Sequence, residues 1–130
     1  MSERTPQTIV TSHQAFRQLQ HLGRLEVEEF WVLALHANKR LIGMERIFRG
    51  TVDACPVFPR DVFRAACRWN ASSLIIAHNH PSGDARPSAE DLAITQHLCA
   101  GGRLLGIPLV DHLVIAGAEF WSFADHGFDF

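Results

Sequence analysis

The sequence predicts a single α/β domain in which helices flank a mixed β-sheet. Segments with two-residue hydrophobic periodicity alternate along the chain with segments of helical periodicity. The chain has 130 residues, of which 47% are hydrophobic and 20% are charged. This length and composition suffice to bury a core without disulfides or a structural metal. No internal repeat, low-complexity segment or linker interrupts the chain.

A helix is expected near the N-terminus. Thr11 or Ser12 can serve as its N-cap, and Thr11 followed by Gln14 has the spacing of a capping box. The helix runs toward Leu22, and Gly23 provides a natural stop.

From Glu28 the pattern becomes that of a β-strand. Alternate residues form two apolar faces: Phe30, Val32 and Ala34 on one, and Trp31, Leu33 and Leu35 on the other. Two apolar faces are typical of a central strand that is covered on both sides. A turn at 37–39 leads into a second strand over 40–48, and Gly50 and Thr51 break its pattern.

The middle of the chain predicts a second helix and a buried strand. Residues 55–58 form a short extended piece, and Pro59 suits the first turn of the helix. The apolar positions of this helix are Val62, Phe63, Ala66 and Cys67. A very apolar strand over 74–80 follows, and residues 81–87 form a loop rich in proline and glycine.

The last part of the chain predicts one helix and two strands. Ser88 opens the helix, which we expect to end near Gly101 and Gly102. The strands cover 107–115 and 120–123, with a turn at Gly117 between them. Pro108 indicates a strand end or a sheet edge.

The composition disfavours several classes of protein. Twelve Lys and Arg residues against 14 Asp and Glu residues give a net charge of −2, whereas proteins that bind nucleic acid mainly through phosphates are usually basic. Arg60, Arg64 and Arg68 recur at helical spacing, which allows a local basic patch, but we favour a solvated helix face. No apolar run approaches the roughly 18 residues that span a bilayer, so no membrane association is expected.

The cysteines and the N-terminus favour a cytoplasmic protein. Cys55, Cys67 and Cys99 have no CxxC spacing and are expected to be reduced, mostly buried thiols. The N-terminus lacks the basic start and the long apolar block of a secretory signal.

The most informative residues are His78-Asn79-His80, followed by Ser88 and Asp91. Two histidines two apart on a strand point to the same face and can converge on one metal ion. A carboxylate from the next element would complete three ligands and leave the fourth position open, as catalytic zinc requires. Two simpler interpretations compete. The histidines can be an exposed pair, or Ser88 and Asp91 can form a capping box, which is hard to combine with metal binding in the same geometry.

The pattern HxH-x7-S-x2-D resembles the JAMM (MPN+) metalloprotease motif, and HNHPSG followed by PS-x2-D resembles its RadC branch. Further segments similar to RadC-type proteins occur in the same order at 48–51, 59–62, 77–83, 105–107 and 110–112. The resemblance implies a JAB1/MPN domain of cytidine-deaminase-like architecture. It covers residues 26–130, with residues 1–25 as an N-terminal helix leading into the domain.

The resemblance also implies a site. His78, His80 and Asp91 correspond to zinc (Zn2+) ligands, and Ser88 is expected to hydrogen-bond the developing oxyanion. An upstream glutamate would act as the general base, and the E-x-F pattern assigns that role to Glu28.

Several neighbouring residues leave alternatives open. Glu26 and Glu29 are rivals of Glu28, and strand alternation lets only one of Glu28 and Glu29 face the metal. Ser82 and Asp84 fit ordinary turn chemistry between the ligands. Asp111-His112 interrupts an apolar strand, either as a pair that orients a ligand or as structural core residues.

The expected function is that of a JAMM-type zinc metallopeptidase that hydrolyses a peptide or isopeptide bond with metal-activated water. The alternative is a non-catalytic metal-binding or DNA-repair-associated interaction module. The expected partner is a peptide or protein substrate. Direct DNA binding is doubtful, because about 25 residues before the domain are too few for the helix-hairpin-helix region of longer relatives.

The oligomeric state is left open between monomer and homodimer. An apolar C-terminus can pack inward, which we favour, or form a dimer contact. Its members are Trp121, Phe123, Phe128 and Phe130.

Overall fold

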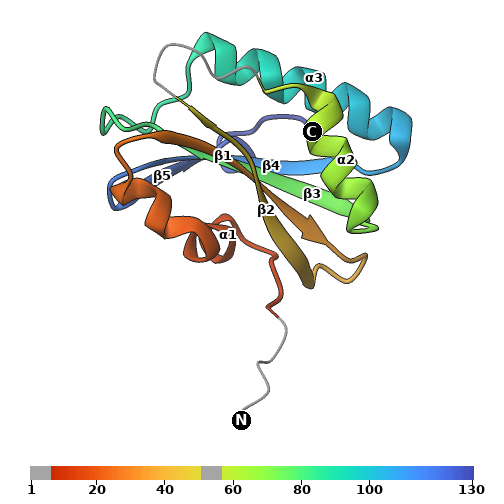
Figure 1. The fold of residues 1–130 in the computed structure, drawn as a ribbon. Helices are drawn as coiled ribbons and strands as arrows, with labels where there is room; N and C mark the ends of the chain where they lie inside the picture. Colours follow the sequence, from red (N-terminus) through yellow and green to blue (C-terminus); the bar gives the residue numbers. More distant parts are fainter. Residues whose placement is uncertain (1–6, 51–56) are drawn as a thin grey trace.

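The computed structural model describes residues 7–50 and 57–130, which form three layers (Figure 1). Helices α2 (Pro59–Arg68) and α3 (Ala89–Leu105) cover one face of a five-stranded sheet, and α1 (Ser12–Leu19) covers the other. The sheet order is β2 (Leu41–Gly50), β1 (Glu28–Leu35), β3 (Ser73–Asn79), β4 (Leu109–Ala116) and β5 (Glu119–Ser122). The predicted mixed α/β fold is confirmed, and it is consistent with a JAB/MPN domain.

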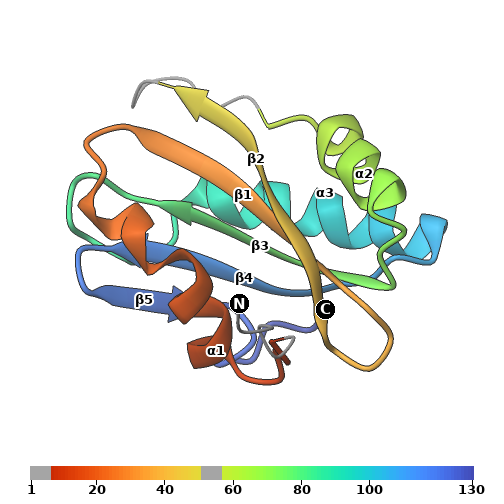
Figure 2. The same cartoon turned by 60° about the horizontal axis from the view of Figure 1, so that its bottom comes forward.

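Strand direction follows from the connections, as Figure 2 shows. β1 pairs antiparallel with both β2 and β3, whereas β3 pairs parallel with β4 through the crossover that contains α3. β5 returns antiparallel beside β4 after a turn at Gly117. Pro108 therefore marks the start of an interior strand, since β4 has a neighbour on each side.

Alternation along β1 and β3 divides the core into two clusters. Phe30, Val32 and Ile76 face α2 and α3, whereas Leu33 and Ile75 face α1 and the 3₁₀ helix η1 (Gln20–Arg24) that continues it. β1 is thus covered on both faces, as its apolar pattern predicts.

Local signals set the helix starts. Thr11 and Gln14 form the predicted capping box of α1. Pro59 occupies the first turn of α2 without costing a hydrogen bond. The arginine stripe of α2 is exposed, as predicted. In the described part of the chain, no helix is both long enough and apolar enough to cross a membrane.

Several local predictions need correction. Cys67 is exposed and Ala65 takes its place on the buried face of α2, while Cys99 is buried as expected. By contrast, Phe58 has the extended backbone predicted for 55–58 (φ −94°, ψ 131°), and Thr51, Cys55 and the rest of 51–56 lie outside the described residues. β3 ends at Asn79, so His80 is the first residue beyond the strand.

Three of the four C-terminal aromatic residues pack inward, as favoured, whereas Trp121 is half-buried and stacks on His126. Phe123 is buried, and Phe128 and Phe130 pack against the core beneath α2 and α3.

Helix α3 does not end at its paired glycines. It continues to Leu105, and Gly106 ends it in the left-handed conformation with φ of 73°. Gly102 is needed for a different reason: a Cβ there would lie 2.5 Å from the carbonyl oxygen of Ile107. The glycine lets the turn into β4 lie directly against the helix.

Gly102→Ala should therefore destabilise the protein although alanine favours helices. We expect the free energy of unfolding to fall by about 1–3 kcal/mol, as for other overpacked core sites. Denaturant unfolding of the metal-free protein measures the change. Leu104→Ala, at a position in the same helix that is 87% exposed, is the control and should change stability by less than about 0.5 kcal/mol. An alanine at Gly102 that stabilises the protein would contradict the close approach.

Candidate metal centre

A pocket of about 460 Å³ opens at the end of β3 where the His-Asn-His segment leaves the sheet. Glu28, His78, His80, Ser88 and Asp91 all line it. Apolar side chains from β1 and α3, including Phe30 and Ile94, form part of its wall. A few polar groups that converge in a partly apolar pocket are typical of ligand and active sites.

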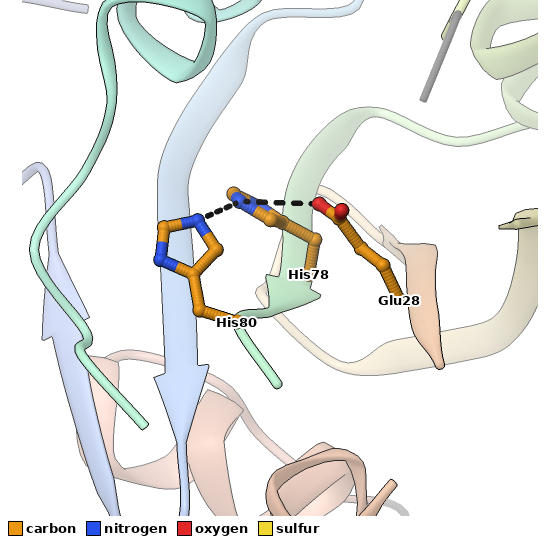
Figure 3. Close-up of side chains that lie close together, drawn as sticks. All are labelled: Glu28, His78 and His80. Carbon is orange, nitrogen blue, oxygen red and sulfur yellow. Dashed lines mark hydrogen bonds and ion pairs between the residues drawn. The ribbon is translucent and has the colours of Figure 1, made fainter. Parts of the chain in front are cut away.

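The pairing of β1 with β3 brings Glu28 to the histidines. Phe30 lies directly opposite His78 in the antiparallel register, and Glu28, two residues earlier, is on the same face as Phe30. One oxygen of Glu28 lies 4.0 Å from Nε2 of His78. Figure 3 shows Glu28 and His80 on either side of the His78 ring.

Three donor groups converge more closely. Nε2 of His78 lies 3.1 Å from Nε2 of His80 and 3.0 Å from Oδ1 of Asp91, and Nε2 of His80 lies 3.0 Å from Oδ2 of Asp91. A tetrahedron with corners about 2.0–2.1 Å from a central zinc has edges of roughly 3.3 Å. The donor set therefore fits a zinc ion. Glu28, His78 and His80 also offer atoms within 4.8 Å of one another.

The loop between the ligands orients His80. Its Nδ1 lies 2.8 Å from the carbonyl oxygen of Asp84, which can only accept, so Nδ1 carries a proton. In the neutral ring, Nε2 then presents its lone pair to the site. The Asp84 side chain pairs with Arg86, which lowers the Asp84 pKa to about 2 and holds the loop. Ser82 accepts a hydrogen bond from the Asp84 amide, so both residues shape the turn as predicted.

Asp91 both caps helix α3 and contacts the two histidines, two roles that its spacing in the sequence made hard to combine. Its Oδ2 accepts a hydrogen bond from the Ser88 amide and Ser88 Oγ accepts one from the Asp91 amide, which completes the capping box of α3. The same carboxylate contacts both histidines. Among the described residues, no acceptor receives the hydroxyl proton of Ser88, which lines the pocket.

The other glutamates are placed elsewhere. Glu29 points to the opposite face of β1, where it accepts a hydrogen bond from the Trp31 indole and pairs with Arg46 and Arg49. Glu26 is exposed before the strand begins. Of the three candidates, only Glu28 lines the pocket.

Asn79, to which the sequence assigned no role of its own, holds the start of β1 in place. Its Oδ1 accepts a hydrogen bond of 2.7 Å from the Glu29 amide, and its Nδ2 donates one of 3.0 Å to the Val27 carbonyl. The two bonds hold the backbone on both sides of Glu28. An amide between two histidines at the end of an apolar strand was the available signal, but the partner strand could not be known.

Asp111 and His112 point to opposite faces of β4. Asp111 binds the C-terminal turn, accepting hydrogen bonds from the Ser122 hydroxyl and the Ala124 amide. His112 is fully buried and its Nε2 lies 2.8 Å from Nδ1 of His78. Asp111 is therefore structural, and His112 contacts a member of the site.

Burial and the neighbouring groups shift the acid–base properties of the site. Burial raises the pKa of Glu28, and His78 and His80 partly offset this effect. Burial would also raise the pKa of Asp91, but the close approach of the His78 and His80 rings outweighs burial and holds that pKa far below its ordinary value. The hydrogen bond to Asp91 raises the pKa of His80 against the opposing effect of burial. Burial lowers the pKa of His112 well below its ordinary value.

Comparison with known proteins shows the family of the chain. Residues 9–128 match the RadC-like JAB domain. The chain belongs to this family. The chain is 48% identical over 106 residues to a UPF0758 protein of Chromobacterium violaceum. These residues are 82% of this chain and 47% of the relative. It is 41% identical over 125 residues to a UPF0758 protein of Thermotoga maritima, covering 96% of this chain and 56% of the relative.

A third relative matches over more of its own length. UPF0758 protein YfjY of Escherichia coli K12 is 44% identical over 119 residues, which are 90% of this chain and 74% of the relative. The chain thus spans about half the length of the C. violaceum and T. maritima relatives. The names of these relatives state no activity. Family membership and the Glu/His/His group together fit a metal-dependent hydrolase.

Asn79→Ala should weaken the start of β1, because it leaves the Glu29 amide and the Val27 carbonyl without their partner. We expect the free energy of unfolding to fall by about 2 kcal/mol or more, since each buried unsatisfied group costs about 1–3 kcal/mol. Thermal or denaturant unfolding measures the loss. Asn38→Ala, which removes a single exposed turn bond to the Arg40 amide, is the control and should cost less. Equal losses in the two variants would contradict the role of Asn79 in holding β1.

The pair formed by His80 and Asp91 predicts how the metal-free protein responds to pH. The pKa of His80 is raised in the folded protein, so protonated His80 stabilises the fold fully below about pH 6.5. This stabilisation is lost as the pH rises through the pKa of His80 in the folded protein. The pKa of Asp91 is lowered in the folded protein, so ionised Asp91 continues to stabilise the fold until the pH falls below about 4. His80→Gln should therefore cost more stability at pH 5.5 than at pH 8.5, by about 1 kcal/mol.

Thermal unfolding in the presence of a chelator, with wild type measured at both pH values, checks this difference. Zinc-loaded wild type should show the opposite trend, because ligands must lose protons to bind metal. A His80→Gln cost that does not change with pH would contradict the ion pair.

Proposed function

We propose that the chain is a zinc-dependent hydrolase of the JAMM type that cleaves a peptide or isopeptide bond. The observation that supports this most directly is the convergence of His78, His80 and Asp91 within 3.0–3.1 Å of one another in a pocket. Three protein ligands beside an open pocket are typical of catalytic zinc, whereas structural zinc takes four.

In this proposal His78, His80 and Asp91 hold the metal. A bound zinc would act as a Lewis acid and lower the pKa of water toward 7. The ligand set combines two neutral imidazoles with one carboxylate. With these ligands, a bound zinc ion would keep a net positive charge, which would favour binding of a water molecule and of a substrate carbonyl oxygen.

Glu28 is assigned the general base. It lies on the His78 side of the pocket, 4.0 Å from Nε2 of His78, which is too far for a hydrogen bond. Its carboxylate can therefore take a proton from water that enters the pocket and return it to the leaving amine. Burial raises its pKa toward the working pH, which improves proton transfer to the leaving group.

Ser88 is assigned the stabilisation of the oxyanion. Its oxygen accepts the Asp91 amide hydrogen, so the hydroxyl proton is available for a substrate oxygen. Capping and catalysis use different parts of the same hydroxyl group. The proposed partner is a peptide or protein substrate, and the proposed location is the cytoplasm, in keeping with the free thiols of Cys67 and Cys99.

Zinc content is the first test. We expect about one zinc per chain in wild type by elemental analysis, after purification without metal-affinity resin or chelators, and much less in Asp91→Ala. Asp91→Asn retains an oxygen that can cap α3 but has a weaker ligand, so it separates metal loss from cap loss. Glu90→Ala, at the neighbouring exposed position, is the control and should retain zinc. Wild type without zinc after reconstitution would reject the proposal.

Glu28→Gln should retain zinc and lose turnover by a factor of about 10²–10⁴, because the base is removed while the ligands stay. Cleavage of a mixed peptide library by the zinc-loaded protein, read by mass spectrometry, is the measurement. Undiminished cleavage by this variant would remove Glu28 from the base role. Zinc binding by wild type with no cleavage of any peptide would favour the non-catalytic metal-binding module instead.

A further inference from the structure

A buried chain of hydrogen bonds connects helix α3 to the ligand face of His78. Thr95 Oγ1 lies 2.7 Å from the carbonyl oxygen of Asp91 and 2.5 Å from Nδ1 of His112, and Nε2 of His112 lies 2.8 Å from Nδ1 of His78. Thr95 and His112 have no exposed surface, and His78 is 2% exposed. Water therefore does not replace any partner in this chain.

The direction of each bond follows from the first one. A carbonyl oxygen only accepts, so the Thr95 hydroxyl must donate its single proton to Asp91. Thr95 Oγ1 can then only accept from Nδ1 of His112, which places the His112 proton on Nδ1. In the neutral ring of His112, Nε2 is left as an acceptor, so Nδ1 of His78 must donate to it. In the neutral ring of His78, Nε2 is then left with its lone pair, and this is the atom that faces His80 and Asp91.

We propose that Thr95 and His112 are positioning residues that hold His78 in the one tautomer able to bind a metal through Nε2. The proposal rests on the metal site proposed above. Packing supports it, because the ring of Phe123 stacks on His112 at 4.7 Å with an angle of 4° and the ring of Phe30 stacks on His78 at 5.9 Å. Both rings are therefore held in the planes that the hydrogen bonds require.

This series of hydrogen bonds also connects the two elements that supply the proposed metal ligands. Thr95 donates to the backbone of Asp91 one turn earlier in α3, while His112 on β4 supports His78 on β3. The hydrogen bonds thus begin at the His78 ring, which donates, and end at the Asp91 carbonyl, which accepts. A loss of the Thr95 hydroxyl would free His112 to place its proton on Nε2. That proton would then compete for Nδ1 of His78 and drive the His78 proton to the metal-binding nitrogen.

Zinc affinity of the full chain provides the test, measured by competition with a chromophoric chelator at pH 7.5. Thr95→Val has nearly the same shape without the hydroxyl and should weaken zinc binding about 10–100-fold, the usual effect of removing a group that orients a ligand. Thr95→Ser keeps the hydroxyl and should bind zinc within a few-fold of wild type. His112→Leu should weaken binding like Thr95→Val, whereas His112→Gln keeps an acceptor for His78 and should recover part of the affinity.

Ser122→Ala controls for general destabilisation. It removes a buried hydrogen bond to Asp111, outside the chain of bonds that reaches His78, and should leave zinc affinity unchanged. Nitrogen-15 NMR of the histidine side chains supplies a readout that a purely structural role would not move. His78 should carry its proton on Nδ1 in wild type and in Thr95→Ser, with a shift toward Nε2 in metal-free Thr95→Val.

The outcomes separate this proposal from the proposed function. Wild-type zinc affinity in both Thr95→Val and His112→Leu, with the His78 tautomer unchanged, would overturn the positioning role and leave the metal site intact. A wild type that binds no zinc would overturn both. Reduced affinity in Thr95→Val that Thr95→Ser restores, together with the tautomer shift, would establish it.

Discussion

The antiparallel register of β1 against β3 is the constraint on which the site depends. Phe30 pairs with His78, so Glu28 extends along the face that carries the histidines. A slip by one residue would reverse the faces of β1 and bring Glu29, with its arginine partners, to the pocket. Asn79 holds this register at the start of β1, next to the pocket, because its side chain hydrogen-bonds to the backbone before and after Glu28.

The site places an unusual amount of polarity beneath an apolar sheet. His78, Asp91, Thr95 and His112 are buried on the face that also holds Val32 and Ile76. Buried polar groups cost stability unless each one is hydrogen-bonded. Here every one has a partner within 3.1 Å. An apolar residue at these positions would give a simpler core, so the arrangement favours a chemical role over a stabilising one.

Much of the architecture could be predicted because its signals are local. Capping boxes at Thr11 and Ser88 and the alternation that begins at Glu28 depend on residues within a few positions of each other. The length of α3 could not be predicted, because Gly102 is required by Ile107 packing against it. The exposure of Cys67 likewise depends on how α2 rotates against the sheet.

The candidate site shows the same division. The spacing of His78, His80 and Asp91 was visible in the sequence, and the faces of β1 separated Glu28 from Glu29. The partners of Asn79 and His112 were not visible. The partners of Asn79 lie 50 and 52 residues away in the chain, and His112 lies 34 residues from His78. These contacts depend on strand order and register, which no local pattern specifies.

Asp91 has one more consequence, which concerns motion. Its Oδ2 holds the amide of Ser88 and thereby closes the first turn of a helix of 17 residues. A cation bound to this oxygen would compete with the Ser88 amide for it, at a helix end where backbone dipoles already place partial positive charge. Metal occupancy and fraying of α3 would then be linked, and the amide protons of the first turn would exchange with solvent at a rate that depends on how full the site is.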